Sequence, residues 1–234
     1  MGEVKWMQEK KYGVMVHYLS NIQPRREKER FSDWNAMVDA FDGNRFADDV
    51  ERMGAGWVIF PFGQNSGHYC SPNSMLDGWW FDGCYNSVEK DFLRTHGWSN
   101  ERFDYGEWKA AACAGNPDAV IAMCPGAEAM GYAFREQDYL AGEANTLNHK
   151  PDGPLIDGMQ WHCLIWLDCR WGHWKQAGEI EAPRFTDEEL MDFYQGCMEN
   201  GGAVTWNIGI YQDGQMAEKT VEQIIRLKPQ FDIV

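Results

Sequence analysis

The sequence of 234 residues contains few positive charges and no long apolar run. Lys and Arg number 21 against 36 Asp and Glu, which gives a formal net charge of −15. This excess of negative charge argues against nucleic acid and anionic membranes as partners. No apolar stretch reaches the roughly 20 residues of a membrane-spanning helix, and the first residues lack the apolar core of a signal peptide. We therefore expect a cytoplasmic protein that acts on a neutral small molecule.

Motifs for several common chemistries are also missing. The seven cysteines include no C-x-x-C pair, which excludes a zinc ribbon and a thioredoxin-type redox site. Scattered cysteines near apolar runs are typical of reduced, buried side chains. The sequence has no H-x-x-x-H or H-E-x-x-H pair, so we expect neither a metal nor another cofactor. The G-x-S-x-G elbow of a serine hydrolase is absent as well.

Aromatic side chains, in contrast, are abundant. They make up 14% of the chain and include 12 Trp. Many of them pack in cores, but Trp and Tyr also stack on the apolar faces of sugar rings, which favours a small carbohydrate as the ligand. The hydrophobic share of 44% is enough for a core, and the length fits a single domain over residues 1–234.

Short apolar runs alternate with helical patterns along the chain. Most of the runs are continuously apolar, which is typical of parallel strands covered on both faces. The alternation predicts an α/β fold of the (β/α)8-barrel type. The expected strands are residues 12–18, 57–62, 78–82, 119–125, 138–143, 159–168 and 203–209, and the expected helices are 44–53, 102–114, 186–200 and 217–227.

One connection is too short for this pattern. Residues 63–77 separate two expected parallel strands, yet they are rich in Gly, Ser and Asn and carry no helical stripe. A parallel crossover normally contains a helix. We therefore expect an incomplete, truncated parallel barrel of about seven strands. Because such a barrel exposes two strand edges, we also expect a homodimer, or an exchanged segment, to cover them.

Polar and aromatic residues gather where the expected strands end, which is the active-site face of an α/β barrel. Asp82 and Glu143 could form a glycosidase pair, with Asp82 as nucleophile and Glu143 as general acid/base. A simple Asp-Gly turn is the alternative for Asp82, and a structural role in the core is the alternative for His162. The candidate substrate-binding residues are His17, Gln64, Asn65, His68, Trp80, Trp161, His162, Trp171 and Asn207.

Several motifs, in order, resemble the α-L-fucosidases of glycoside hydrolase family 29. Residues 6–18 (WMQEKKYGVMVHY) are similar to the opening of that family, and WFDG at residues 80–83 resembles the strand that carries its nucleophile. Residues 138–143 (DYLAGE) resemble the segment that holds the acid/base, and 201–214 (GGAVTWNIGIYQDG) resemble a later motif. The resemblance covers nearly the whole chain. It implies a retaining α-L-fucosidase with Asp82 and Glu143 in the two catalytic roles and His17 at a sugar-binding position.

The chain also departs from that family. The paired histidines that follow its second strand fall on Gln64 and Asn65, and a glutamate falls on His162. These changes alter the sugar-binding shell. Two alternatives therefore stay open: a non-catalytic carbohydrate-binding or assembly protein on a degenerate fucosidase scaffold, and a metal-dependent hydrolase.

Overall fold

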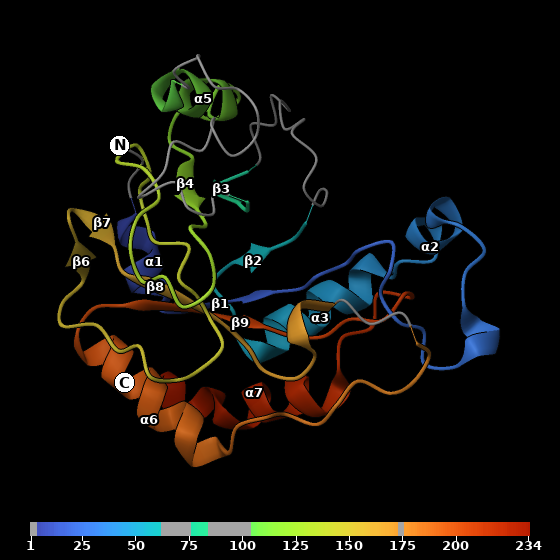
Figure 1. The fold of residues 1–234 in the computed structure, drawn as a ribbon. Coiled ribbons are helices and arrows are strands. Elements are labelled where there is room, and N and C mark those ends of the chain that lie inside the picture. The colour runs from blue at the N-terminus through green and yellow to red at the C-terminus, as the bar shows by residue number, and fades with distance from the viewer. Residues whose placement is uncertain (1–3, 62–75, 84–103, 173–175) are drawn as a thin grey trace.

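The structure is a computed structural model that describes residues 4–61, 76–83, 104–172 and 176–234. A five-stranded parallel sheet in the order β2-β1-β9-β8-β5 lies at its centre (Figure 1). A parallel pair, β3-β4, and an antiparallel hairpin, β6-β7, accompany it. The strands are β1 (Tyr12–Met15), β2 (Val58–Ile59), β3 (Gly78–Phe81), β4 (Val120–Met123), β5 (Glu143–Ala144), β6 (Leu155–Ile156), β7 (Met159–Gln160), β8 (His162–Trp166) and β9 (Ala203–Asn207).

The segment before β5 connects the β3-β4 pair to the central sheet. Asp138 N–H donates to Ile121 O of β4 at 2.7 Å, and Tyr139 forms a parallel bridge with Gln160 of β7. The strands therefore follow one another as in a parallel barrel, with β2 and β3 at the two ends. No pairing joins β2 to β3 within the described residues, and residues 62–75 between them lie outside that range. Truncation and closure of the barrel stay predictions.

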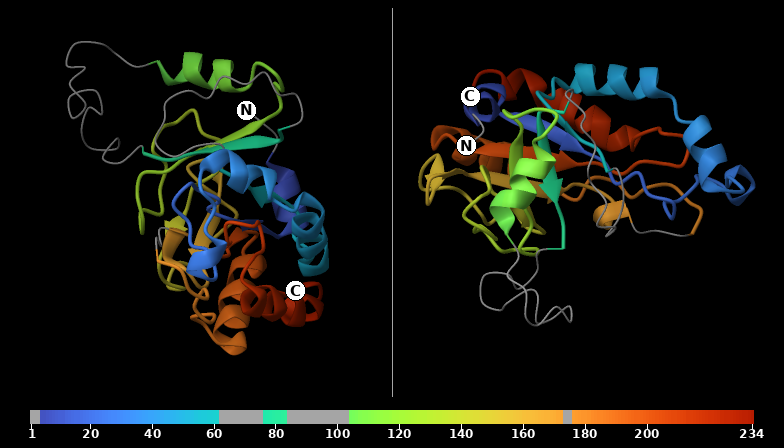
Figure 2. Two further views of the ribbon diagram at one scale, coloured as in Figure 1. Left: turned by 90° about the vertical axis from the view of Figure 1, so that its right-hand side faces the viewer. Right: turned by 90° about the horizontal axis from the view of Figure 1, so that it is seen from above.

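Helices cover the outer side of the curved sheet. In Figure 1, α6 and α7 lie beneath β1, β8 and β9, and α5 lies on the opposite side, above β3 and β4; Figure 2 shows the same arrangement from two further directions. The helices are α1 (Lys5–Lys10), α2 (Trp34–Asp39), α3 (Gly43–Met53), α5 (Tyr105–Ala112), α6 (Asp187–Glu199) and α7 (Glu218–Phe231), with short 3₁₀ turns at Glu27–Glu29 and Arg170–Gly172.

Capping and periodicity explain where the longer helices begin and end. The Thr186 hydroxyl accepts from Glu189 N–H and the Glu189 carboxylate from Thr186 N–H, so the expected capping box opens α6. Gly54, at φ 75°, ends α3 in a left-handed conformation. The last helix runs four residues beyond its expected end at residue 227, because Phe231 is fully buried against the rings of Tyr12 and Trp206.

The inner side of the sheet holds a hydrogen-bonded layer below the carboxyl ends of the strands. His162 Nδ1 donates to Leu140 O at 2.9 Å. The Thr205 hydroxyl donates to His162 Nε2 at 2.7 Å and accepts from Trp57 Nε1 at 2.9 Å. Burial lowers the pKa of His162 to about 4, so its ring is neutral. Helix α1 lies at the amino ends of the strands, where Met7 is buried.

Two expected strands differ from the structure. The run 138–143 is interrupted at Gly142, whose φ of 62° turns the chain before β5 begins at Glu143. The run 159–168 is divided into β7 and β8, because Met159–Gln160 also pairs with β6, which lies outside the expected strands. Two-residue strands carry too little periodicity to be recognised.

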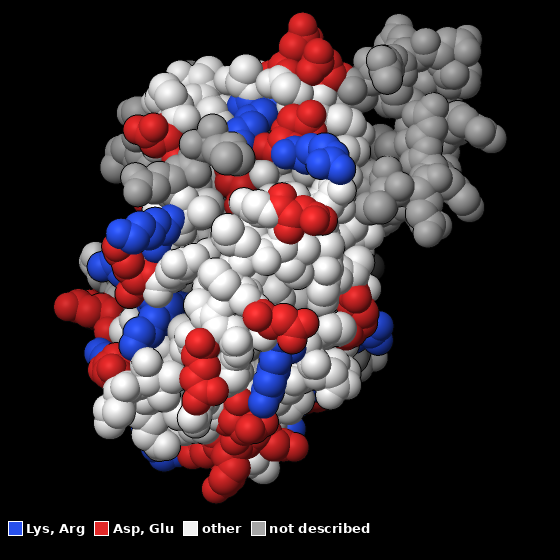
Figure 3. Space-filling view, turned by 90° about the vertical axis from the view of Figure 1, so that its left-hand side faces the viewer, with Lys and Arg blue, Asp and Glu red and all other residues white. Residues whose placement is uncertain are grey.

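Acidic side chains are spread over the surface, in keeping with the net charge. On the face shown in Figure 3, Lys and Arg side chains lie singly or beside acidic ones, without a continuous basic patch among the described residues. Within the described part of the chain, no helix has the length and apolar character needed to cross a membrane.

Candidate active site

Two carboxylates and a thiol meet at the carboxyl ends of β3 and β4 and the first residue of β5. Trp79 and Phe81 of β3 pack outward against α5, so strand alternation turns Asp82 inward. Cys124 and Glu143 lie on the same inner side, Cys124 directly after β4 and Glu143 as the first residue of β5. One carboxylate oxygen from each acid and the Cys124 sulfur all lie within 4.8 Å of one another. Two carboxylate oxygens within 4.8 Å of each other are compatible with the roughly 5 Å between the carboxyl groups of a retaining glycosidase, whereas those of an inverting one lie roughly 6.5–9.5 Å apart.

The two acids have different surroundings. Asp82 is exposed, and its Oδ1 accepts from Gly83 N–H at 2.7 Å. Glu143 is half-buried: burial raises the pKa of its carboxyl, a hydrogen bond from Cys124 partly offsets this, and the Asp82 charge raises it further. Water can therefore solvate a negative charge on Asp82, whereas the environment of Glu143 favours its protonated form. Different environments for two facing carboxylates suit one nucleophile and one acid.

A second group lies at the ends of β1 and β9. His17 Nδ1 donates to Asn207 Oδ1 at 2.7 Å, and the Trp171 ring packs 5.6 Å from the His17 ring. Trp171 has a φ of 51°, and the adjacent Gly172 approaches His17 so closely that a Cβ would lie 2.8 Å from His17 Cβ. Asn207 is buried, and its Nδ2 has no partner among the described residues.

Trp166 and Asn145, which the sequence patterns did not single out, lie between these two groups. Trp166 is opposite Asn207 in the β8–β9 register, and its Nε1 donates to Asn145 Oδ1 at 2.9 Å. Asn145 follows Glu143 by two residues. The Arg184 guanidinium lies 3.2 Å from the centre of the Trp166 ring. Inward side chains thus form a continuous row from His17 to Asp82. The sequence signal for this row is the alternation of inward and outward side chains at the strand ends. Continuing that alternation to the end of β8 would have included Trp166.

The other predicted residues lie elsewhere. Trp80 is on the inner side below Asp82, and its Nε1 donates to Ala141 O at 3.2 Å. His162 is completely buried, and protein partners hold both of its ring nitrogens, so it lies beneath the row described above. Gln64, Asn65 and His68 fall outside the described residues.

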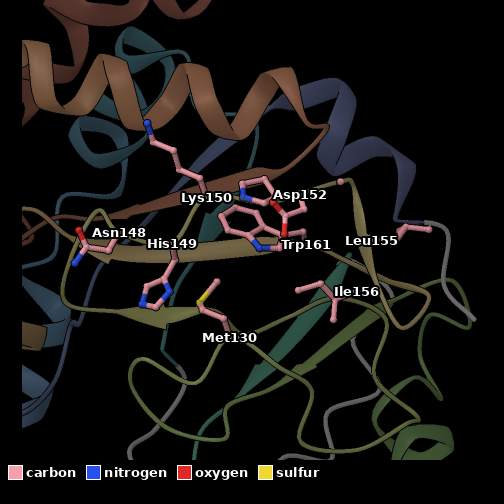
Figure 4. A pocket seen from close by; sticks show the side chains of 10 residues that line it. Met130, Asn148, His149, Lys150, Asp152, Leu155, Ile156 and Trp161 are labelled. Carbon is pink, nitrogen blue, oxygen red and sulfur yellow. The ribbon is translucent and has the colours of Figure 1, made fainter.

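Trp161 faces the outer side of the sheet, away from the two acids. It is almost fully buried and lines a shallow pocket of about 370 Å³ beside the β6-β7 hairpin. Figure 4 shows this pocket with Met130, His149 and Lys150 around Trp161. The structure therefore does not bring Trp161 together with Asp82 and Glu143.

The same three side chains also form a group that could hold a metal ion. Asp82, Cys124 and Glu143 would offer two oxygens and one sulfur to a divalent cation. A cysteine binds metal as thiolate. Burial and the nearby Glu143 and Asp82 charges hold the pKa of the Cys124 thiol far above its ordinary value, and the thiol donates to Glu143 Oε2 at 3.0 Å, so in this geometry the two groups are hydrogen-bonded to each other.

Comparisons with known proteins relate the fold to fucosidases. The structure is similar to α-L-fucosidase AlfC from Lactobacillus casei in complex with α-L-fucose (TM-score 0.59, 10% identity, 99% of each chain covered). It is also similar to α-L-fucosidase isoenzyme 1 from Paenibacillus thiaminolyticus (TM-score 0.60, 11% identity, 98% of this chain and 75% of that one). A third solved structure, SpGH29, matches with a TM-score of 0.60 and 9% identity, over 98% of this chain and 68% of that one.

At these identities the likeness concerns the fold alone. Neither a protein-family model nor a curated protein sequence matches the chain. The α/β fold with a parallel sheet and the resemblance to family 29 fucosidases at the level of fold are thus confirmed.

Proposed function

We propose that this protein is a retaining glycosidase that hydrolyses α-L-fucosides or glycosides of a closely related sugar. One observation carries the proposal: Asp82, directly after β3, and Glu143, which begins β5, approach within 4.8 Å, and burial raises the pKa of Glu143. The fucosidases that share the fold support the choice of sugar. The geometry of the acids supports the choice of mechanism.

In the first step of the proposed reaction, an Asp82 carboxylate oxygen attacks the anomeric carbon. The glycosidic bond breaks, and its oxygen leaves with the proton of Glu143, which gives an ester between Asp82 and the sugar. In the second step, Glu143, now ionised, takes a proton from water while the water oxygen attacks the anomeric carbon. Asp82 is released as carboxylate, and Glu143 regains its proton.

The rest of the row would bind the sugar. His17 and Asn207 present polar atoms for hydroxyl groups, and the rings of Trp171 and Trp166 present apolar faces for the sugar ring. We also propose Gln64, Asn65 and His68 as ligands of the sugar hydroxyls, on the resemblance of their segment to the family. His162 and Trp80, which lie beneath this row, would hold its residues in place.

The test compares hydrolysis of 4-nitrophenyl α-L-fucoside and of an unactivated fucosyl disaccharide by wild type, Asp82→Asn and Glu143→Gln. Asp82→Asn should abolish turnover of both substrates, because no carboxylate remains to form the ester. Glu143→Gln should lower kcat on the disaccharide by about 10²–10⁴-fold. It should affect the nitrophenyl substrate much less, because nitrophenolate leaves without a proton.

Asp77→Asn is the matched control, because Asp77 is an exposed acid at the amino end of the same strand. It should leave both rates unchanged. NMR of the first-formed sugar should show retained configuration. Wild-type protein that is folded but hydrolyses neither substrate, or an Asp82→Asn variant with wild-type rates, would refute the proposal. Sugar binding without turnover would instead support the non-catalytic alternative.

A further inference from the structure

Cys124 occupies a fixed position against one oxygen of Glu143. The side chain is fully buried on the inner side of the sheet, directly after β4, and its Sγ lies 3.0 Å from Glu143 Oε2. Gly126, two residues further on, has a φ of 119°, a conformation that side chains rarely allow, so the chain turns shortly after the thiol.

The direction of the hydrogen bond between Cys124 and Glu143 follows from the protons available. Burial and the neighbouring carboxylates keep the pKa of the thiol far above its ordinary value, so the thiol has one proton to donate. Glu143 Oε2 is the acceptor in reach. A carboxyl oxygen that already accepts a hydrogen bond from the thiol is a weaker site for protonation, so the acidic proton of Glu143 belongs on Oε1.

We propose that Cys124 is a positioning residue whose thiol donates to Oε2 of Glu143 and thereby places the acidic proton on Oε1. This inference rests on the proposed function, because a general acid/base needs one defined oxygen that faces the leaving group. The hydrogen bond from the thiol also stabilises the ionised carboxylate of Glu143. It therefore lowers the pKa of Glu143, whereas burial and the Asp82 charge raise it. Cys124 would let Glu143 act as acid in the first step and as base in the second.

The variants are Cys124→Ala, which removes the donor, and Cys124→Ser, which retains one. Cys163→Ala is the matched control, because Cys163 is equally buried but faces outward from β8. The first measurement is a ¹³C NMR titration of the Glu143 side-chain carboxyl, assigned by its loss in Glu143→Gln. We expect the pKa of Glu143 to be higher in Cys124→Ala than in wild type. It should stay near the wild-type value in Cys124→Ser and Cys163→Ala.

The second measurement is the pH profile of kcat/KM for an aryl α-L-fucoside. Its alkaline limb, which reports loss of the acidic proton, should move to higher pH in Cys124→Ala and not in the other two variants. The kcat of Cys124→Ala should fall by about tenfold, the effect of one lost hydrogen bond on an oriented group. If Cys124→Ala does not fold, Cys124→Val supplies a side chain of similar size without a donor.

The two measurements separate this inference from the proposed function. An unchanged Glu143 titration in Cys124→Ala would overturn the inference, whether or not the protein hydrolyses glycosides. A shifted titration with an unshifted pH profile would overturn it too. If the titration shifts but the protein hydrolyses no glycoside, the hydrogen bond from Cys124 to Glu143 is supported. In that case only the proposed glycosidase function is overturned.

Discussion

Asp82 forms a turn and also faces a second acid. Its Oδ1 accepts from Gly83 N–H, and Gly83 has a φ of 85°, as expected for an Asp-Gly turn. The same carboxyl group lies within 4.8 Å of Cys124 and Glu143. The structural and functional interpretations of this residue are therefore compatible, because the turn holds the carboxyl at the end of β3.

Asp168 is a buried acid whose titration should reduce stability at neutral pH. Its Oδ1 accepts from Gly209 N–H at 2.8 Å and from Cys169 N–H, yet burial raises the pKa of the carboxyl to about 6. Because this pKa lies above the value near 3.9 of an unfolded chain, its stabilising contribution is complete below pH 4. That contribution is lost as pH rises through 6, by about 3 kcal/mol in total.

Asp168→Asn should remove this pH dependence, because an amide cannot ionise and its oxygen can still accept from Gly209. We expect the variant to gain about 3 kcal/mol of unfolding free energy relative to wild type between pH 4 and pH 7.5. Urea unfolding at the two pH values measures this difference. Asp48→Asn, at an exposed position of α3, is the control and should show no such gain. Equal pH dependence in wild type and Asp168→Asn would contradict the argument.

At the scale of elements, Gly142 controls where β5 begins. Its φ is 62°, and a Cβ at this position would lie 1.9 Å from the carbonyl oxygen of His162. This backbone cannot move away cheaply, because Leu164 N–H donates to Gly142 O at 2.8 Å. The close approach to β8 therefore requires glycine, and it fixes the direction in which the next residue, Glu143, projects.

Gly142→Ala should therefore destabilise the fold by about 3 kcal/mol or more, or prevent folding. Gly153→Ala is the control, because a Cβ at Gly153 would meet nothing within 4 Å, and it should change stability by less than about 0.5 kcal/mol. Thermal unfolding and the soluble yield of both variants measure the effect. A Gly142→Ala variant as stable as wild type would show that the strands separate easily.

Elements with caps and a long periodic stripe could be predicted from the sequence, and shorter ones could not. The helices α3, α5, α6 and α7 were expected within a few residues of their observed ends. Helices α1 and α2 have six residues each, too few for a recognisable stripe. The site shows the same limit. Strand ends suggested Asp82 and Glu143 as a pair without giving their distance, and Cys124 was interpreted as a buried core thiol because its partner lies on another strand.

At the scale of the whole molecule, two strands each have one edge that pairs with no other strand among the described residues. Strand β2 lies at one end of the five-stranded sheet, β3 is the outer strand of the β3-β4 pair, and Val58 of β2 is 38% exposed. Parallel edge strands offer backbone groups to another chain, and natural proteins usually cover them. A homodimer that buries these edges stays our prediction.

The dimer should appear in light scattering as a mass of about twice 27.0 kDa at micromolar concentration. Val58→Lys should shift the protein toward monomer, because a lysine on an edge strand opposes strand pairing. Val38→Lys is the control, since Val38 is a similarly exposed apolar residue on α2, and it should leave the mass unchanged. A monomeric, non-aggregating wild type would contradict the prediction. Because the proposed acids lie on β3 and β5 of one chain, such a monomer could still be an active glycosidase.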